Sequence, residues 1–152
     1  MNVDVTEGDA RDIAVIMPIM QTAFDPDFTE AWTGAQCLSA LAIPGSRLLI
    51  ARCEGLVAGF ALSRWVLESE ELLMIGVDID HQRKGVGSAL LSEMILRARQ
   101  AKREQLFLEV RDGNAAYNLY YNVGFLPIGR RKQYYKGTNG QSSDAITMAF
   151  TL

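Results

Sequence analysis

The chain has 152 residues, of which 49% are hydrophobic and 22% are charged, and its formal net charge is −3. This size and composition predict one folded domain over residues 1–152 and exclude a disordered chain, while the negative charge argues against nucleic-acid binding. The acidic N-terminus differs from a signal peptide, and no apolar run approaches the ~18 residues that span a bilayer, so we expect a cytoplasmic protein without a membrane partner.

The spacing of apolar residues predicts eleven elements in the order β-α-α-β-β-β-α-β-α-β-β. Asp9 is expected to cap a helix that reaches about Phe24, and Pro18 predicts a kink or a break within it. Thr33 is expected to cap a second, short helix. Glu54 and Gly55 are typical of a hairpin turn. The expected strands cover residues 2–6, 47–53, 56–66, 71–80, 105–110, 125–135 and 145–151.

Two further helices are expected in the C-terminal half. One follows Gly87 and carries an apolar stripe as far as Ala98, and the other covers residues 115–123 and ends at Gly124. A polar loop, KGTNGQSS, separates the last two strands. The chain shows no internal repeat and no linker, so the sequence predicts a single α/β domain with a mixed sheet.

The segment HQRKGVGSALL, residues 81–91, is a short basic turn between an expected strand and an expected helix. Backbone N–H groups at the start of a helix attract anions, and the helix dipole adds to this attraction. Gly85 and Gly87 allow the backbone to approach a ligand closely, and Arg83 and Lys84 supply charged donors. Leu90 stands where a dinucleotide fingerprint needs Gly or Ala. The turn therefore indicates a pyrophosphate site or, alternatively, a glycine-containing loop with solvated basic residues.

The turn Gln82-Arg83-Lys84-Gly85-Val86-Gly87, with this order of elements, resembles the [QR]-x-x-G-x-[GA] pattern of the GNAT acetyltransferase superfamily. The segments ELLMIGVDIDHQRKGVGSALL, LFLEVRDGNAAYNLYYNVGF and RRKQYYKGTNGQSSDAITMAF are similar to the RimI branch of that superfamily, and AWTGAQ resembles its Trp-Ser/Thr segment. The resemblance covers nearly the whole chain and is strongest from residue 71 onward. It implies the GNAT fold, a central mixed, mostly antiparallel twisted sheet of about seven strands flanked by about four helices.

The resemblance implies an enzyme that transfers the acetyl group of acetyl-coenzyme A (acetyl-CoA) to the N-terminal amine of a protein, typically a ribosomal protein. In such an enzyme the glycine turn binds the coenzyme pyrophosphate, and a segment of the strand before it lies beside the thioester. The coenzyme-binding residues implied in this way are Ile75, Gly76, Val77, Arg83, Lys84, Gly85, Val86, Gly87, Ser88 and Asn114. Two alternatives remain open: an acetyltransferase of a small-molecule amine, and a non-catalytic acyl-CoA-binding module.

Glu109 is a charged residue inside the apolar strand QLFLEV. From the residues alone it is either a structural partner of Arg111, which lies on the same strand face, or a carboxylate available for chemistry. The resemblance implies that it is the general base that deprotonates the amine. His81 is the single histidine, and Cys37 and Cys53 are isolated, so neither a metal site nor a Cys–His nucleophile pair is expected.

The resemblance also implies a tyrosine that acts as general acid toward the leaving thiolate, and two adjacent tyrosines are candidates. Alignment on the following Gly124 selects Tyr120, whereas counting from Asn114 selects Tyr121, because this chain has one residue fewer than the family pattern between the asparagine and the tyrosine. We prefer Tyr120, which keeps the apolar helix face formed by Ala116, Leu119 and Val123. A packing role for the tyrosine is the alternative. Asn114 is also expected to cap this helix.

A basic and aromatic strand follows this helix. It is interpreted either as a solvated edge strand, because charged edges resist aggregation, or as one wall of a peptide groove. Trp32 is expected to pack at a helix entry in preference to contacting substrate. The residues of the basic and aromatic strand are Arg130, Arg131, Lys132, Tyr134 and Tyr135.

Overall fold

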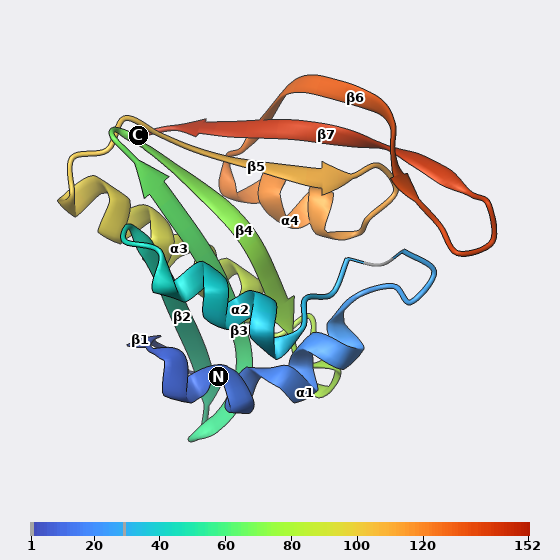
Figure 1. The fold of residues 1–152 in the computed structure, drawn as a ribbon. Helices are drawn as coiled ribbons and strands as arrows, with labels where there is room; N and C mark the ends of the chain where they lie inside the picture. The colour runs from blue at the N-terminus through green and yellow to red at the C-terminus, as the bar shows by residue number, and fades with distance from the viewer. Residues whose placement is uncertain (1, 29) are drawn as a thin grey trace.

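The computed structural model describes residues 2–28 and 30–152 of the chain. The strands within that part are β1 (Val3–Gly8), β2 (Ser46–Cys53), β3 (Leu56–Val66), β4 (Ser69–Val77), β5 (Gln105–Arg111), β6 (Leu126–Lys136) and β7 (Ser142–Thr151). These seven strands form one sheet in the spatial order β1-β2-β3-β4-β5-β7-β6 (Figure 1). The β4–β5 pair is parallel and the other neighbouring pairs are antiparallel. The expectation of a mixed, mostly antiparallel sheet is therefore confirmed.

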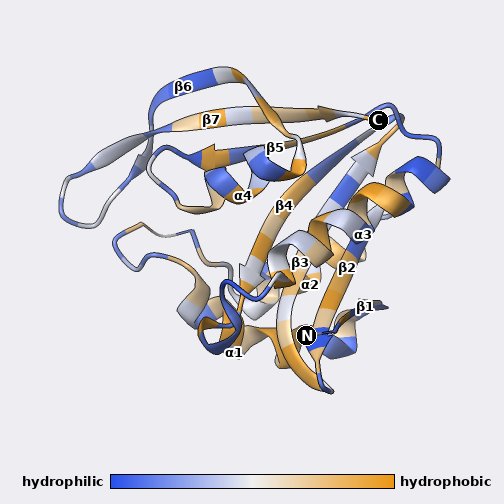
Figure 2. Cartoon of the chain, turned by 180° about the vertical axis from the view of Figure 1, so that it is seen from behind, coloured by the Kyte–Doolittle hydropathy of each residue, from blue (hydrophilic) through white to orange (hydrophobic). Residues whose placement is uncertain are grey.

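Four α-helices flank the sheet in the described residues: α1 (Ile13–Ala23), α2 (Gly34–Ala42), α3 (Val86–Gln100) and α4 (Ala116–Val123). One apolar cluster joins α1 and α2 to one face of the sheet around Phe60, and a second joins α3 and α4 to the other face around Leu106. Figure 2 shows hydrophobic residues concentrated along β2, β3 and β4. No helix of the described residues has the length and apolar character needed to cross a membrane.

The cap predicted at Thr33 is present, and the cap predicted at Asp9 begins a 3₁₀ turn in place of the α-helix. Thr33 Oγ1 accepts a hydrogen bond from the Gln36 N–H at 3.1 Å, and the Gln36 side chain accepts one from the Thr33 N–H at 2.7 Å, so the predicted cap of α2 is confirmed. The Asp9 carboxylate accepts a hydrogen bond from the Arg11 N–H at 2.9 Å. This cap begins a 3₁₀ turn (Ala10–Asp12), which then leads into α1.

One expectation about element boundaries is wrong, and one is narrowed to a single alternative. α1 is one helix through Pro18, so of the predicted kink or break the break does not occur; its buried face, centred on Ile16 and Met20, packs on the sheet and offsets the hydrogen bond lost at proline. The strand expected to reach residue 80 ends at Val77. Asp78 begins a 3₁₀ turn there, because its carbonyl accepts from the His81 N–H and its carboxylate contacts the His81 ring, both at 2.8 Å.

The sheet opens at its middle, between β4 and β5. The parallel pairing covers only residues 69–72 of β4 and residues 105–108 of β5. Beyond these residues β4 stays paired with β3 as far as Val77, and β5 stays paired with β7 as far as Arg111. The two strands therefore diverge like the arms of a V (Figure 1), and the residues after Leu72 and Leu108 border the gap.

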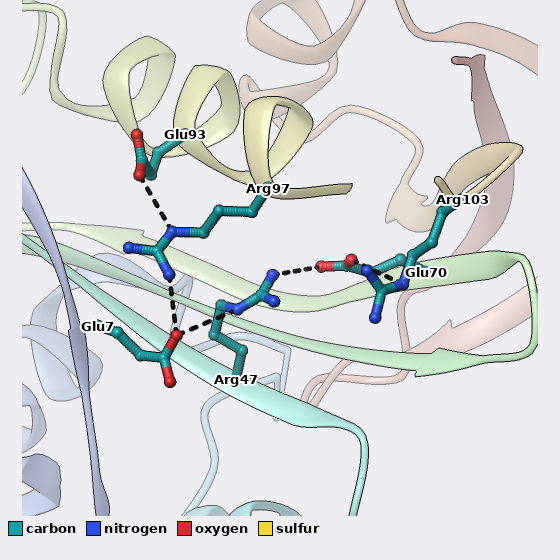
Figure 3. Close-up of polar contacts among 6 residues, drawn as sticks. All are labelled: Glu7, Arg47, Glu70, Glu93, Arg97 and Arg103. Atoms are coloured by element: carbon teal, nitrogen blue, oxygen red, sulfur yellow. Dashed lines mark hydrogen bonds and ion pairs between the residues drawn. The ribbon is translucent and has the colours of Figure 1, made fainter. Parts of the chain in front are cut away.

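A buried charge cluster lies at the closed end of this V. The fully buried Glu70 carboxylate of β4 lies 3.6 Å from Arg47 Nη1 and 3.4 Å from Arg103 Nε. Both guanidinium groups also lie over the Trp65 ring, 4.6 and 4.2 Å from its centroid. Removing Glu70 would leave both largely buried guanidinium groups without this partner, a loss of about 3–5 kcal/mol, whereas removing one arginine leaves Glu70 paired with the other. Figure 3 shows the wider network of Glu7, Arg47, Glu70, Glu93, Arg97 and Arg103.

Candidate active site

A pocket of about 400 Å³ occupies the gap between β4 and β5. Its walls come from these two strands, from α4 and β6, from the end of α1 and from the segment before α2. Most of its polar groups are carboxylates and phenols, which suit proton transfer more than metal binding. The polar residues that the argument uses are Glu30, Glu71, Glu109, Asn114, Tyr120 and Tyr135.

Glu109 is the first β5 residue beyond the parallel pairing, so its side chain enters the pocket at the point where the V opens. The side chain is 23% exposed, and Arg131 Nε lies 3.4 Å from its Oε2 atom. Among the described residues this oxygen is buried without a hydrogen-bond partner. The alternative of a structural pair with Arg111 is wrong, because Arg111 Nε donates to Glu30 Oε1 at 2.7 Å.

Tyr120 lines the pocket, whereas Tyr121 does not. The two side chains point about 100° apart on α4 and are 6% and 53% exposed. Tyr121 instead stacks on Tyr117, with ring centroids 6.2 Å apart and planes inclined by 13°. Burial, followed by the charge of Glu30, raises the pKa of Tyr120 well above its ordinary value. Tyr120 is therefore a protonated phenol at neutral pH. The expected apolar face of α4 (Ala116, Leu119 and Val123) packs on the core.

The aromatic part of the basic strand faces the pocket. Tyr134 and Tyr135 of β6 line it. Burial, followed by the charges of Glu30 and Glu109, raises the pKa of Tyr135 to about 12. Arg130 instead contacts Asp112 and Asp144 at 2.9 and 2.7 Å, and Lys132 is exposed. This strand is thus both an exposed edge and, through its two tyrosines, a wall of the pocket.

The glycine turn leaves the start of α3 without a cap from any side chain. Gly85 occupies the capping position with φ of 82°, and Arg83 also has a positive φ, of 62°. The first N–H groups of the helix, at residues 86–88, have no acceptor within the helix itself. Arg83, Lys84 and Ser88 are exposed around these groups, while Val86 is buried. This arrangement of successive backbone N–H groups fits an anion such as a pyrophosphate.

Gly87 has a packing role that the sequence did not reveal. It is buried, and a Cβ atom at this position would lie 2.7 Å from Leu119 Cδ2 of α4. The glycine therefore permits close contact between α3 and α4, whereas the sequence interpretation assigned it to the approach of a ligand.

The remaining predicted site residues lie along the edge of the gap. Ile75 lines the pocket, and Gly76 and Val77 follow it on β4, where they pair with β3 on one side. Asn114 also lines the pocket, and its Oδ1 accepts a hydrogen bond from the Ala116 N–H at 2.9 Å, although the residue at the capping position of α4 is Ala115 and not, as predicted, Asn114.

Three pocket features were missed or given less weight in the sequence interpretation. Glu30 and its partner Arg111 had no assigned role in the pocket, because 81 positions separate them and Glu30 stands in no recognisable motif, while Arg111 was considered only as a partner of Glu109. Trp32 both lines the pocket and packs against the apolar cluster of α1, so its two interpretations are compatible. A tryptophan beside acidic residues in a loop is the one signal that could have indicated this wall.

Comparison with known proteins identifies the family. The profile of the acetyltransferase (GNAT) domain matches residues 44–127. The chain belongs to the GNAT acetyltransferase family. It is similar to the N-alpha-acetyltransferase RimI of Mycobacterium tuberculosis, with 34% identity over 149 residues that cover 95% of this chain and 87% of that protein. It is also 41% identical over 99 residues to the ribosomal protein bS18-alanine N-acetyltransferase of Escherichia coli, a match that spans 64% of this chain and 66% of that protein, just under two thirds.

Solved structures agree with this assignment. The crystal structure of the ribosomal-protein-S18-alanine N-acetyltransferase from Escherichia coli has a TM-score of 0.89 at 31% identity, covering 99% of this chain and 94% of that one. The structure of Ard1 from Thermoplasma volcanium has a TM-score of 0.83 at 26% identity, covering 100% and 99%. The GNAT fold and the resemblance to the RimI branch, both predicted from the sequence, are therefore confirmed.

Proposed function

We propose that this chain transfers the acetyl group of acetyl-CoA to the α-amine of a protein N-terminus, with a ribosomal protein as the substrate. The observation that carries the proposal is the pocket in the β4–β5 gap, where the Glu109 carboxylate and the buried Tyr120 phenol face one space. The substrate class is supported by the Escherichia coli relative, whose name specifies alanine acetylation of ribosomal protein bS18.

The start of α3 supports acetyl-CoA as the co-substrate. The uncapped N–H groups of residues 86–88, with Arg83 and Lys84 beside them, would hold its pyrophosphate. Asn114 and the β4 edge at Ile75-Gly76-Val77 would contact the part of the molecule that reaches the pocket. Two proteins that share the fold, from Salmonella typhimurium and Sinorhizobium meliloti at 24% and 22% identity, have structures with acetyl-CoA. The co-substrate supplies an acetyl group activated as a thioester.

Glu109 is the proposed general base. The reacting amine must be neutral, and an α-amine titrates near ~7.8 whereas a lysine side chain titrates near ~10.4. At neutral pH the neutral fraction of the α-amine is therefore roughly a few hundred times larger, a difference of about 3.5 kcal/mol. Glu109 lies in the same pocket as Tyr120, and its Oε2 makes no hydrogen bond among the described residues, with Arg131 Nε 3.4 Å away; the carboxylate is the group proposed to accept the proton of the amine, directly or through water.

Tyr120 is the proposed general acid. Its hydroxyl is protonated at neutral pH, so the O–H can donate a hydrogen bond to the departing sulfur; the raised pKa makes it a weaker acid than an exposed tyrosine, so hydrogen bonding contributes more than full proton transfer before the thiolate leaves. Beyond Leu72 the β4 edge that faces the gap is not paired with β5, so N–H groups of this edge are available to stabilise negative charge on the acetyl oxygen.

The direct test incubates the full chain with acetyl-CoA and short peptides and follows the peptide mass. A peptide that begins with alanine should gain one acetyl group. The same peptide with a blocked N-terminus and one internal lysine should gain none. Turnover of small free amines but of no peptide would refute the proposal in favour of the small-molecule alternative. Binding of acetyl-CoA without any turnover would instead identify a binding module.

A further inference from the structure

Arg111 connects the candidate base strand to the segment between α1 and α2. It lies two residues beyond Glu109 on β5, and its side chain is 11% exposed. Its Nε donates to Glu30 Oε1 at 2.7 Å, its Nη2 lies 4.0 Å from Asp25 Oδ2, and its guanidinium lies 4.2 Å from the centroid of the Phe28 ring. One largely buried cation therefore contacts three residues that lie between α1 and α2, namely Asp25, Phe28 and Glu30.

The same segment contacts the turn between β6 and β7. Phe28 forms an isolated bridge with Gly137, and the Thr138 N–H donates to the Asp27 carbonyl at 2.9 Å. The segment and the hairpin lie side by side at the open end of the V (Figure 1). Because Glu30 lines the pocket opposite residues of β5, Arg111 holds one wall of the pocket in place.

The contact also has an electrostatic consequence. Glu30 is a second carboxylate in the pocket that holds Glu109, and Arg111 compensates its charge. An uncompensated carboxylate would favour the ammonium form of a bound amine, which cannot react, and would raise the pKa of a neighbouring carboxyl. The other charged and titratable groups that line or border the pocket are Asp25 beside Arg111, Glu71 of β4 with its partner Arg64, Arg131 beside Glu109, Tyr120 of α4, and Tyr134 and Tyr135 of β6.

We infer that Arg111 is a positioning residue for the reaction: it fastens the residues of the pocket wall that it contacts and compensates the charge of Glu30. Glu30 paired with Arg111, like Glu71 paired with Arg64, then adds no uncompensated negative charge beside the amine that Glu109 is to deprotonate. The inference rests on the proposed function, because its electrostatic part requires an amine substrate. Arg111 itself contacts neither substrate nor reacting atoms in this scheme. It acts through Glu30 and through the placement of the wall.

The experiment compares Arg111→Met, Arg111→Lys, Glu30→Gln and the double variant Arg111→Met/Glu30→Gln with the parent chain. Arg97→Met is the matched control, because Arg97 is also an ion-paired arginine, bound to Glu7 and Glu93, and does not line the pocket. Three quantities are measured: KM for an alanine peptide and for acetyl-CoA, the pH dependence of kcat, and hydrogen exchange of the backbone amide of Thr138.

In Arg111→Met we expect the peptide KM to rise on the order of tenfold, equivalent to 1.4 kcal/mol, while the KM for acetyl-CoA changes less than about twofold. The acidic limb of kcat should move to higher pH by about one unit, because the uncompensated charge of Glu30 favours the ammonium form of the bound amine. In Arg111→Lys the acidic limb of kcat should lie close to its position in the parent chain. In the double variant the acidic limb should also return to the parent position, while the peptide KM stays high. The Thr138 amide should exchange faster in Arg111→Met and not in Arg97→Met.

An unchanged peptide KM and an unchanged acidic limb in Arg111→Met would overturn the inference and leave Arg111 a stabilising contact. If Arg111→Met does not fold, Arg111→Lys and Glu30→Gln decide: wild-type peptide KM in both would overturn it. Hydrogen exchange tests the fastening independently of activity. If the parent chain turns over no amine at all, the proposed function fails and the electrostatic role fails with it, whereas faster Thr138 exchange would still support the fastening of the wall.

Discussion

Tyr120→Phe and Tyr121→Phe form the sharpest pair of substitutions in this chain. Each removes one phenolic oxygen from adjacent positions of α4, but the two oxygens lie in different surroundings. Tyr120 is 6% exposed and lines the pocket, whereas Tyr121 is 53% exposed and stacks on Tyr117. If the hydroxyl of Tyr120 serves the departing sulfur, only the first substitution should lower kcat.

The expected magnitudes separate catalysis from stability. Loss of a positioned proton donor should lower kcat by about 10- to 10³-fold, which corresponds to roughly 1.4–4 kcal/mol of activation free energy. The same substitution leaves the ring, with its edge-on contact with Phe125, in place, so the free energy of unfolding should change by no more than about 1 kcal/mol. Tyr121→Phe keeps its stacked ring as well and should change either quantity little, with unfolding within about 0.5 kcal/mol of the parent.

Steady-state rates at saturating acetyl-CoA and peptide, measured with thermal unfolding of the same samples, test this pair. Because the pKa of Tyr120 is raised, the parent enzyme should show no loss of kcat from this group on the alkaline side of neutrality. A normal kcat in Tyr120→Phe would refute the donor role. A strongly lowered kcat in Tyr121→Phe together with a normal kcat in Tyr120→Phe would show that counting from Asn114 gives the correct register.

Glu109→Gln keeps the side-chain shape but removes its basicity, so kcat should fall by about 10²- to 10⁴-fold in steady-state assays, while calorimetry should show unchanged acetyl-CoA affinity. Normal turnover across pH 6 to 9 would place the base elsewhere. Gly85→Val introduces a side chain at φ of 82° and should weaken acetyl-CoA binding more than Lys84→Ala, which removes one exposed charge. If calorimetry gives the reverse order, the backbone N–H groups at the start of α3 are not the main pyrophosphate contact. Gly87→Ala places a methyl group 2.7 Å from the terminal Cδ2 of Leu119, which can shift, while alanine favours the helix by up to ~1 kcal/mol, so the unfolding free energy in denaturant titrations should change by no more than about 1 kcal/mol. Full additivity with Leu119→Ala would argue against their contact.

The elements of this fold could be predicted because their signals are local. A capping box starts α2 at Thr33, Gly124 ends α4, and apolar runs separated by the turn at Glu54 and Gly55 mark β2 and β3, whose central residues are buried in succession. Boundaries failed where a contact outside the element decides them. Pro18 remains helical because the helix packs on the sheet, and the strand before the glycine turn ends early because Asp78 closes a turn with His81.

The pairing of charges in the pocket could not be predicted in the same way. Glu109 and Arg111 share a strand face, and sequence spacing alone makes them natural partners. In the structure each finds a partner from a different element: Arg131 of β6 for Glu109, and Glu30, 81 positions away, for Arg111. Which ion-pair partner each side chain finds depends on where β4 and β5 diverge, and residue spacing in the sequence does not predict that point.

Three connections at different levels hold the gap that this chemistry needs. The strands β1 to β4 form one part of the sheet and β5, β7 and β6 the other, and only four residue pairs of β4 and β5 join them. At the closed end of the V, the ion pairs of Glu70 on β4 connect Arg47 of β2 with Arg103, which precedes β5 (Figure 3).

Beside the gap, the contact of Gly87 with Leu119 joins α3 to α4, and so joins the turn suited to a pyrophosphate to the helix that carries Tyr120. Protein interiors are close-packed and transmit strain. A change at the Glu70 cluster or at the contact of Gly87 with Leu119 is therefore expected to alter the placement of Tyr120 relative to Glu109. A substitution far from the pocket, at Glu70 for example, is therefore expected to act on kcat through the width of the gap as well as on stability.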